Sequence, residues 1–370
     1  MLNLKMKKST LLTLLLINFL ALTTRAQINE GAITTSVPFL QISTDARAGG
    51  MGEIGVATSS DAYALFHNAA KIAFNKSKLS VGVSYVPWLR NLTDDIFAGN
   101  FSVVNRFSEN SAWGADLKFF SLGRIDLTDN SGNSTGSINP SEFALSGYYS
   151  LKLSEKFSMG VGLKYINSNL DVDNNSLEAV NSFAVDISAY YQSDEENYGT
   201  FNGRYRIGVN VANIGPKVEY TPGEENFIPT IGKLGGGFDF IFDDYNTLGV
   251  NLEFRKLLVP SSGSLSTRGW FEGMFTSLGD RPFSEELREV NWSLGAEYLY
   301  NNAFAVRAGY FNESETKGNR KFFTLGAGFT AQAFSVDLSY LVNTSDVNNP
   351  LENTLRFSLS FDIGEIYEDY

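Results

Sequence analysis

The chain has 370 residues, of which 43% are hydrophobic and 14% aromatic, and it contains 34 glycines. Its formal net charge of -12 argues against nucleic acid as a partner, because surfaces that bind nucleic acid are basic. There is no cysteine, which excludes disulfides, thiolate metal sites and a cysteine nucleophile.

The first 26 residues have the parts of a secretory signal peptide. Three lysines within the first eight residues precede an apolar stretch over 11–22, and Ala26 provides a small residue for cleavage. The apolar stretch is too short for a membrane anchor, and no cysteine follows it for lipid attachment. We therefore expect residues 1–26 to be a cleaved signal peptide and the mature chain to begin at Gln27.

Residues 27–78 show no regular alternation of apolar and polar side chains. Gly50, Gly52 and Gly55 match the spacing of a dinucleotide-binding fingerprint, but no strand precedes them and no βαβ unit surrounds them. Glycines also let one backbone segment approach another closely. We therefore expect 27–78 to form a short plug, or hatch, on the periplasmic side of the domain that follows, and we expect no cofactor.

From residue 79 to 370 the chain alternates apolar and polar residues in segments of about ten, each followed by turn residues. In 247–255, for example, a row of apolar side chains stands against Asn251, Glu253 and Arg255. About fourteen segments are present, each close to the length that a tilted transmembrane strand needs. They lie near 79–86, 96–105, 111–122, 143–153, 157–165, 183–191, 204–212, 230–242, 247–255, 291–300, 303–311, 321–330, 334–342 and 354–362.

Two features separate a membrane barrel from a soluble β-sandwich or propeller, which also alternates. The central apolar rows carry no charged residue, as a lipid-facing surface requires. The connections also alternate between long and short, except for the acidic stretch 192–203 on the short side. We therefore predict an all-β fold, an antiparallel outer-membrane β-barrel of about fourteen strands. The long connections are 123–142, 169–180, 213–229 and 258–289, and the short ones are 154–156, 243–246, 301–302 and 331–333.

Polar rows with charges of both signs, such as Lys164 and Asp186, favour a filled or narrow lumen over an open porin. Tyrosines and tryptophans near the segment ends suit the aromatic girdles of the two membrane interfaces. The girdle candidates are Trp88, Tyr149, Tyr165, Tyr191, Tyr298, Tyr300, Tyr310 and Tyr340.

The plug carries the run Val-Pro-Phe-Leu over 37–40 and the run Asp-Ala-Arg-Ala-Gly-Gly-Met-Gly over 45–52. These runs resemble the FadL-like outer-membrane family and, more closely, the PorV (LptO) family of the type IX secretion system. The resemblance is sharpest over about residues 36–90. The sequence departs from the usual Trp-Asn-Pro-Ala of the family at 66–70, where it has Phe-His-Asn-Ala-Ala. The plug motif residues are Asp45, Arg47, Gly50, Gly52 and Asn68.

The resemblance implies a specific function. PorV-type proteins associate with an SprA-like translocon and collect secreted cargo through its C-terminal signal domain. They carry the cargo to a PorU-like sortase, which cleaves the signal and attaches the cargo to surface lipopolysaccharide. The resemblance thus implies a shuttle embedded in outer-membrane lipid. The main alternative is a FadL-like transporter of hydrophobic small molecules, and a purely structural barrel is a third possibility. A transporter needs an apolar pocket and a lateral opening, and Gly235–Gly237 could mark a kinked strand there.

No residue set supports catalysis or a metal. His67 is the only histidine and lies in the plug, where a packing or hydrogen-bonding role is the usual one. Carboxylate pairs such as Asp94-Asp95 and Glu285-Glu286 are adjacent in loops, so they are expected to be solvated rather than to form an acid–base pair. We therefore expect no enzyme activity.

The connection 258–289 contains apolar residues at the spacing of a helix face. Two interpretations remain open: the loop folds over the barrel mouth and buries these residues, or it presents them to a partner. If the family resemblance holds, this loop is the first candidate for binding translocon or cargo, followed by 123–142 and 213–229. The candidate residues are Trp270, Phe271, Met274, Phe275 and Leu278.

Overall fold

The computed structural model describes residues 31–88, 95–129, 131–170, 179–261, 268–345, 352 and 354–367. The expected signal peptide, 1–26, lies outside the described residues. None of the helices within the described residues is long and apolar enough to cross a membrane.

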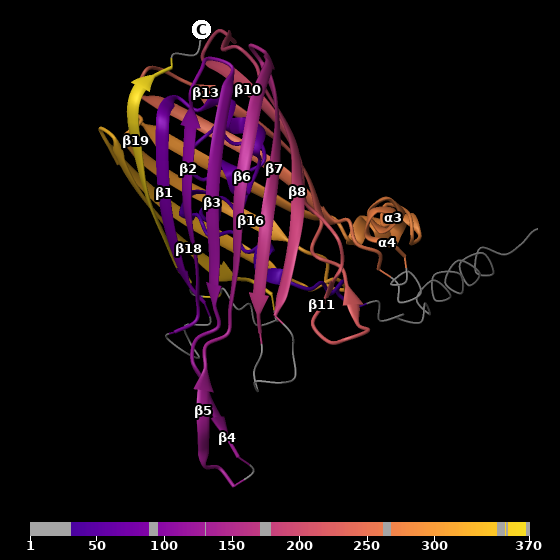
Figure 1. The fold of residues 1–370 in the computed structure, drawn as a ribbon. Coiled ribbons are helices and arrows are strands. Elements are labelled where there is room, and N and C mark those ends of the chain that lie inside the picture. Colours follow the sequence, from indigo (N-terminus) through magenta and orange to yellow (C-terminus); the bar gives the residue numbers. More distant parts are fainter. Residues whose placement is uncertain are drawn as a thin grey trace, which may run out of the picture.

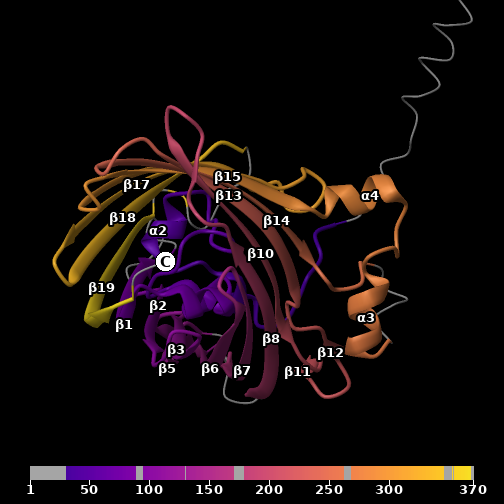
Figure 2. The same cartoon turned by 90° about the horizontal axis from the view of Figure 1, so that it is seen from above.

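Fourteen antiparallel strands within the described residues form one closed barrel, which confirms the predicted fold (Figures 1 and 2). Neighbours in sequence are neighbours in the wall, and the pairs β1–β19 and β10–β13 complete the ring. The strands are β1 (Ser77–Pro87), β2 (Phe97–Arg106), β3 (Ser111–Ser121), β6 (Ser141–Ser154), β7 (Phe157–Asn169), β8 (Val180–Gln192), β10 (Asn202–Ile214), β13 (Ile231–Ile241), β14 (Asn246–Leu257), β15 (Asn291–Tyr300), β16 (Phe304–Asn312), β17 (Lys321–Ala331), β18 (Phe334–Asn343) and β19 (Leu355–Ile366).

The alternation in sequence becomes an outer apolar row and an inner polar row, because successive side chains of a strand point to opposite faces. In β19, Leu355 and Phe357 are 46% and 41% exposed on the outside, whereas Arg356 and Ser358 are 2% and 0% exposed inside. A closed wall also pairs the backbone of its edge strands, which lipid requires because it offers no hydrogen bonds.

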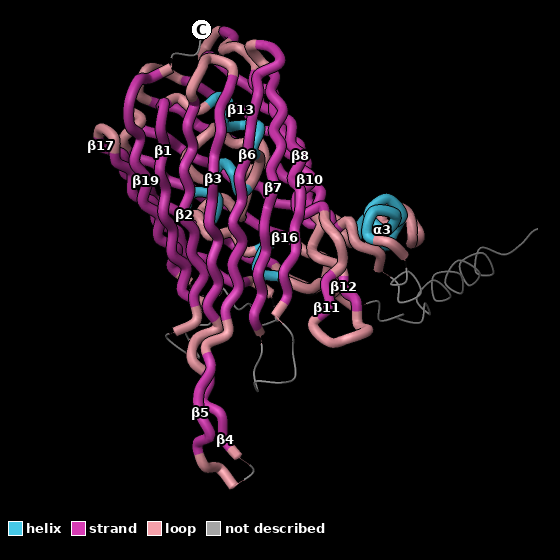
Figure 3. The backbone as a smooth tube through the Cα atoms, in the orientation of Figure 1, coloured by secondary structure: helices cyan, strands magenta, loops and turns pink. Residues whose placement is uncertain are grey.

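The connections alternate in length as predicted, with short turns at the end where the C-terminus lies and long ones at the opposite end (Figures 1 and 3). The exceptional turn between β8 and β10 contains β9 (Glu196–Asn197), which pairs with β10 and extends the wall. The long connections carry the hairpin β4 (Ile125–Thr128) and β5 (Ser134–Ile138), the hairpin β11 (Val218–Glu219) and β12 (Glu225–Asn226), and the helices α3 (Trp270–Thr276) and α4 (Phe283–Arg288).

Aromatic rings cluster on the outside near both ends of the strands. Near the long-loop end, the ring centre of Tyr165 lies 5.4 Å from that of Phe183 and 6.0 Å from that of Phe143. Near the short-turn end, the ring of Tyr191 stacks on that of Tyr205. Trp88 was expected in the girdle but points inward, where it packs against Phe120 at 5.8 Å.

The N-terminal segment lies inside the barrel (Figure 2). Its start is at the long-loop end, where the amide of Ser36 donates to the carbonyl of Phe227 at 2.9 Å. Its end reaches the short-turn end, where Ser158 of β7 donates to the carbonyl of Ala70 at 2.6 Å. The plug therefore fills the length of the lumen. This differs from the expectation that it would be confined to the periplasmic side. Its helices are η1 (Pro38–Gln41), α2 (Ala46–Gly49), η2 (Ala64–Phe66) and η3 (Ala69–Phe74).

Candidate functional site

Glycines on the inner rows of the wall make room for the plug. A Cβ at Gly309 would overlap backbone atoms of Met51 and Gly52, and one at Gly208 would overlap the carbonyl of Val56. Gly235 lies against the side chain of Val56. Because β13 pairs with both neighbours without interruption through this region, the suggested kink is absent. The inner glycines at the plug are Gly82, Gly114, Gly160, Gly208, Gly235, Gly295, Gly309 and Gly326.

The charged residues of the plug motif connect the plug to itself and to the wall. Arg47 binds Asp61 of the plug at 2.7 Å and Glu297 of β15 at 2.8 Å. Asp45 caps α2 by accepting from the amide of Ala48 at 2.7 Å, and its other oxygen lies 2.6 Å from Nε2 of His67. Burial raises the pKa of Asp45, but His67, the amide of Ala48 and Arg356 together lower it by more, so the pKa falls to about 2.

The other motif residues set the path of the plug backbone or bind backbone groups. Gly52 has a φ of +71°, which favours glycine, and its amide donates to Thr324 of β17 at 2.8 Å. Gly50 lies against the Cα of Gly326. Asn68 caps η3 and donates to the carbonyls of Val56 at 2.9 Å and of Ala189 of β8 at 3.0 Å. Asn68 thus fixes the local turn where the family pattern usually has Asn-Pro-Ala.

Glu53 and Lys71 were not singled out by the sequence, yet both are buried charges of the plug. Glu53 accepts from Arg356 of β19 at 2.6 Å and lies 3.4 Å from Arg255 of β14. Burial lowers the pKa of Lys71 to about 8, and its ammonium donates to the carbonyl of Gly55 at 2.7 Å. No signal in the sequence marked these two residues, because a single charged residue outside a periodic pattern does not indicate which distant residue it will contact.

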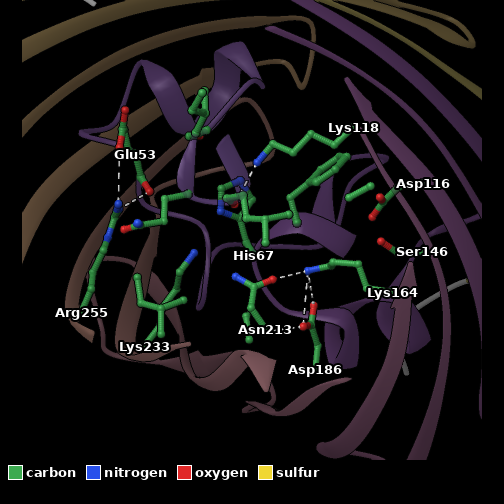
Figure 4. Close-up of a pocket in the computed structure, with 18 of the residues that line it drawn as sticks. Glu53, His67, Asp116, Lys118, Ser146, Lys164, Asp186, Asn213, Lys233 and Arg255 are labelled. Atoms are coloured by element: carbon green, nitrogen blue, oxygen red, sulfur yellow. Dashed lines mark hydrogen bonds and ion pairs between the residues drawn. The ribbon is translucent and has the colours of Figure 1, made fainter. Parts of the chain in front are cut away.

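A polar cavity of about 80 Å³ remains between plug and wall, enough for a few water molecules (Figure 4). Side chains of both signs line it, and Lys164 binds Asp186 at 3.2 Å. The lumen therefore pairs its charges internally, as the sequence suggested. The residues labelled in Figure 4 are Glu53, His67, Asp116, Lys118, Ser146, Lys164, Asp186, Asn213, Lys233 and Arg255.

A second cavity, of about 470 Å³, adjoins the first at the long-loop end. Its apolar wall is formed by plug residues Phe39 and Ile42 together with Trp88 and Phe120. Its rim is charged, but Lys317 is paired with Glu289 at 3.0 Å and Arg320 with Glu313 at 2.8 Å.

The helices α3 and α4 lie outside the barrel, beside its wall, and not over its mouth (Figures 1 and 2). Phe271, Phe275 and Leu278 are 58%, 57% and 60% exposed, Trp270 is also exposed, and Met274 is half-buried. The interpretation in which the loop buries these residues is therefore wrong. The structure separates the two sets of candidate residues, with the plug motif inside the lumen and this apolar face outside.

Polar contacts hold α3 and α4 in place. Glu286 of α4 binds Lys256 of β14 at 2.8 Å, and Asp280 accepts from the amide of Ser261 at 2.8 Å. Asp280, Glu286 and Glu289 are the one acidic group, among the described residues, whose oxygens lie close enough to share a metal ion. The Lys256 ammonium contacts both glutamates and supplies the positive charge there.

A closed antiparallel barrel with an apolar outside, aromatic girdles and a plugged lumen defines an outer-membrane β-barrel protein. A family model described as type IX secretion system protein PorV matches residues 25–264, which is more than half of the chain. The chain belongs to this PorV family. The members of the family are components of a secretion system, and the family is not a known enzyme family.

No curated protein sequence matches the chain. Among solved structures, a FadL homologue of Pseudomonas aeruginosa is similar, with 12% identity, a TM-score of 0.46, and coverage of 90% of this chain and 99% of that one. The toluene transporter TodX of Pseudomonas putida is also similar, with 12% identity, a TM-score of 0.47, and coverage of 85% and 95%.

Proposed function

We propose that this protein is the cargo shuttle of a type IX secretion system. In this proposal it associates with an SprA-like translocon and binds secreted proteins through their C-terminal signal domains. It then delivers them to a PorU-like sortase for attachment to lipopolysaccharide, and it has no catalytic activity of its own. Membership of the PorV family supports a secretion role, and the exposed apolar face of α3 is the observation that favours a binding protein.

The face is suited to a partner because it is both exposed and fixed. An apolar helix face on a protein surface normally turns toward the core. Here Phe271 and Phe275 of α3, and Leu278 just after it, are exposed instead. On the opposite side of α3, Gly273 lies so close to Phe227 and Pro260 that it leaves no room for a side chain. A preorganised face loses little conformational entropy when a partner covers it.

The experiment compares two variants of tagged full-length protein, recovered from gently solubilised outer membranes. The first is the triple variant Phe271→Ser, Phe275→Ser and Leu278→Ser. Burying each of these side chains contributes about 1.5–3 kcal/mol, so their loss should weaken partner binding by more than about 100-fold. The control variant replaces Arg268 and Glu272, a pair on the same segment 3.2 Å apart, with serine.

We expect wild type and the control to recover a very large SprA-like barrel and cargo with signal domains, and the triple variant to lose at least one of them. Equal recovery by all three proteins, with secretion intact, would exclude α3 as the binding face. Recovery of the barrel protein alone from wild-type membranes would exclude the shuttle itself.

The cavity of about 470 Å³ favours a second candidate function, transport of hydrophobic small molecules. A transporter needs an apolar pocket and a lateral opening, and the apolar wall of this cavity next to the plug fits the first of these two requirements. Mass spectrometry of lipid extracts from purified protein tests this. A stoichiometric hydrophobic ligand that is lost on Phe39→Ser substitution would favour the transporter, and extracts without one would count against it.

A further inference from the structure

The barrel wall has a seam at the long-loop end, between β8 and β10. The ladder joining these strands ends at the pair Ile214↔Val185. On its other side β8 continues to pair with β7 as far as Val180↔Ser168. Beyond the pair Ile214↔Val185 the ladder gives 180–184 of β8 no partner on the β10 side. The backbone of Gly215 lies against the carbonyl of Phe183, so the edge is open over 180–182, the one such stretch of β8 within the described wall.

A bulge at Asn213 creates the seam. The register shifts between Val211 and Ile214, and Asn213 has a φ of +59°. The amide of Asn213 donates to Asp186 at 2.7 Å, its side-chain oxygen accepts from Lys164 at 2.6 Å, and its carbonyl accepts from Thr230 at 2.8 Å (Figure 4). Because the bulge is buried and its polar groups are bonded, it is a fixed feature of the wall and not a frayed end.

The loop after β10 covers the inner side of the seam without pairing with it. β11 pairs only with β12, although Val218 packs with Val180 and Ala184 in one apolar cluster. Outside that cluster a groove of about 440 Å³ remains between residues 179–183, at the start of β8, and residues 216–219 of the loop. The groove runs along the open backbone edge.

The groove lies level with the outer aromatic girdle, because Phe183 contacts Tyr165. The long-loop end of an outer-membrane barrel faces the cell exterior. Asn181, Lys217 and Glu219 make the walls of the groove partly polar, so an occupant would enter from the aqueous side. An unpaired strand edge is a template for another strand, and many proteins bind extended peptides in this way.

We propose that the outer end of β8, at 180–182, binds an extended segment of a soluble secreted protein by strand addition. This rests on the proposed shuttle function and names a contact for cargo that is separate from α3. The segment pairs with the free backbone edge. It carries small side chains on its inward positions, because Val218 and Ile228 already fill the inner side. It contains no proline at the paired positions, because proline lacks the N–H that a ladder needs.

The test uses a photo-cross-linking residue at single positions of purified full-length protein in lipid nanodiscs. The probe is an isolated C-terminal signal domain of a secreted protein from the same cells. Asn181 lies on the open stretch, and Phe183 borders it and lines the groove. Ile187 is the control, since it faces outward on the same strand but pairs with both neighbours. We expect at least about tenfold higher cross-link yield at 181 and 183 than at 187. The two positions should attach to probe residues two apart, as strand pairing requires.

A second pair of variants tests the edge by charge. Phe183→Lys places a lysine beside the open edge, where natural proteins use lysine to block strand addition. Phe143→Lys places the same charge in the same girdle, on the fully paired strand β6. We expect only Phe183→Lys to reduce binding of the signal domain, by about tenfold or more.

Equal yields at the three positions, cross-links to lipid or to a second copy of the chain, or attachment without two-residue spacing would each overturn the proposal. If the signal domain still binds wild type and both lysine variants equally, strand addition fails while the shuttle function stands. If wild type does not bind the domain and recovers no secretion partner from membranes, the shuttle function fails as well.

Discussion

Replacing Gly309 by alanine tests whether the plug fills the lumen as described. Gly309 lies on the inner face of β16, and a Cβ there would overlap backbone atoms of Met51 and Gly52. Backbone atoms cannot move aside as a flexible side chain can, so the plug must shift. The control is Gly147→Ala on β6, where an added Cβ meets no atom within 4 Å.

The expected magnitude follows from two contributions. Alanine removes conformational freedom from the unfolded chain in both variants, which stabilises each by about 0.4–1 kcal/mol. Overpacking occurs only at Gly309 and costs about 1–3 kcal/mol. The difference in free energy of unfolding between the two variants therefore isolates the overpacking, about 1–3 kcal/mol.

Urea unfolding in lipid vesicles, followed by tryptophan fluorescence, measures this difference. Because the sequence has no cysteine, a single cysteine placed in the plug can also report how often the plug opens to a thiol reagent. We expect faster labelling in Gly309→Ala than in Gly147→Ala. Equal stability and equal labelling would refute the placement of Met51 and Gly52 against β16.

Three further predictions concern the plug. Asn68→Ala removes three hydrogen bonds and should cost about 3 kcal/mol, at roughly 1 kcal/mol each, in the same urea assay. Glu297→Gln leaves Arg47 without its wall carboxylate and should cost about 3 kcal/mol, seen as faster proteolysis of the plug. The pKa of Asp45 is lowered from 3.8 to about 2, because His67, the amide of Ala48 and Arg356 together outweigh the effect of burial. A lowered folded-state pKa gives stability that is present above about pH 4 and lost as the pH falls toward 2. Unfolding midpoints of wild type and Asp45→Asn should therefore differ at pH 6 and converge near pH 2, and a gap that stays constant would contradict this assignment.

The sequence by itself determined the barrel, because lipid imposes one simple condition on every strand. Each outer side chain must be apolar and the backbone must be fully paired, so a period of two over about ten residues is sufficient to identify the strands. Charges of both signs on the inner rows likewise predicted a filled lumen, and Lys164 and Asp186 do pair there. The plug motif was visible because glycine and charged residues are dense within a few positions.

Only the tertiary structure decided where these parts meet. Arg47 and Glu297 are 250 residues apart, and neither carries a sign of the other. An inner glycine such as Gly309 looks like any strand glycine until the plug is placed against it. The periodicity of 270–278 indicated a helix face but not its direction, because burial depends on what lies opposite. The bulge at Asn213 is held by hydrogen bonds to three other segments. The sequence did not reveal it, because a bulge of one residue leaves the alternation of apolar and polar residues on either side almost unchanged.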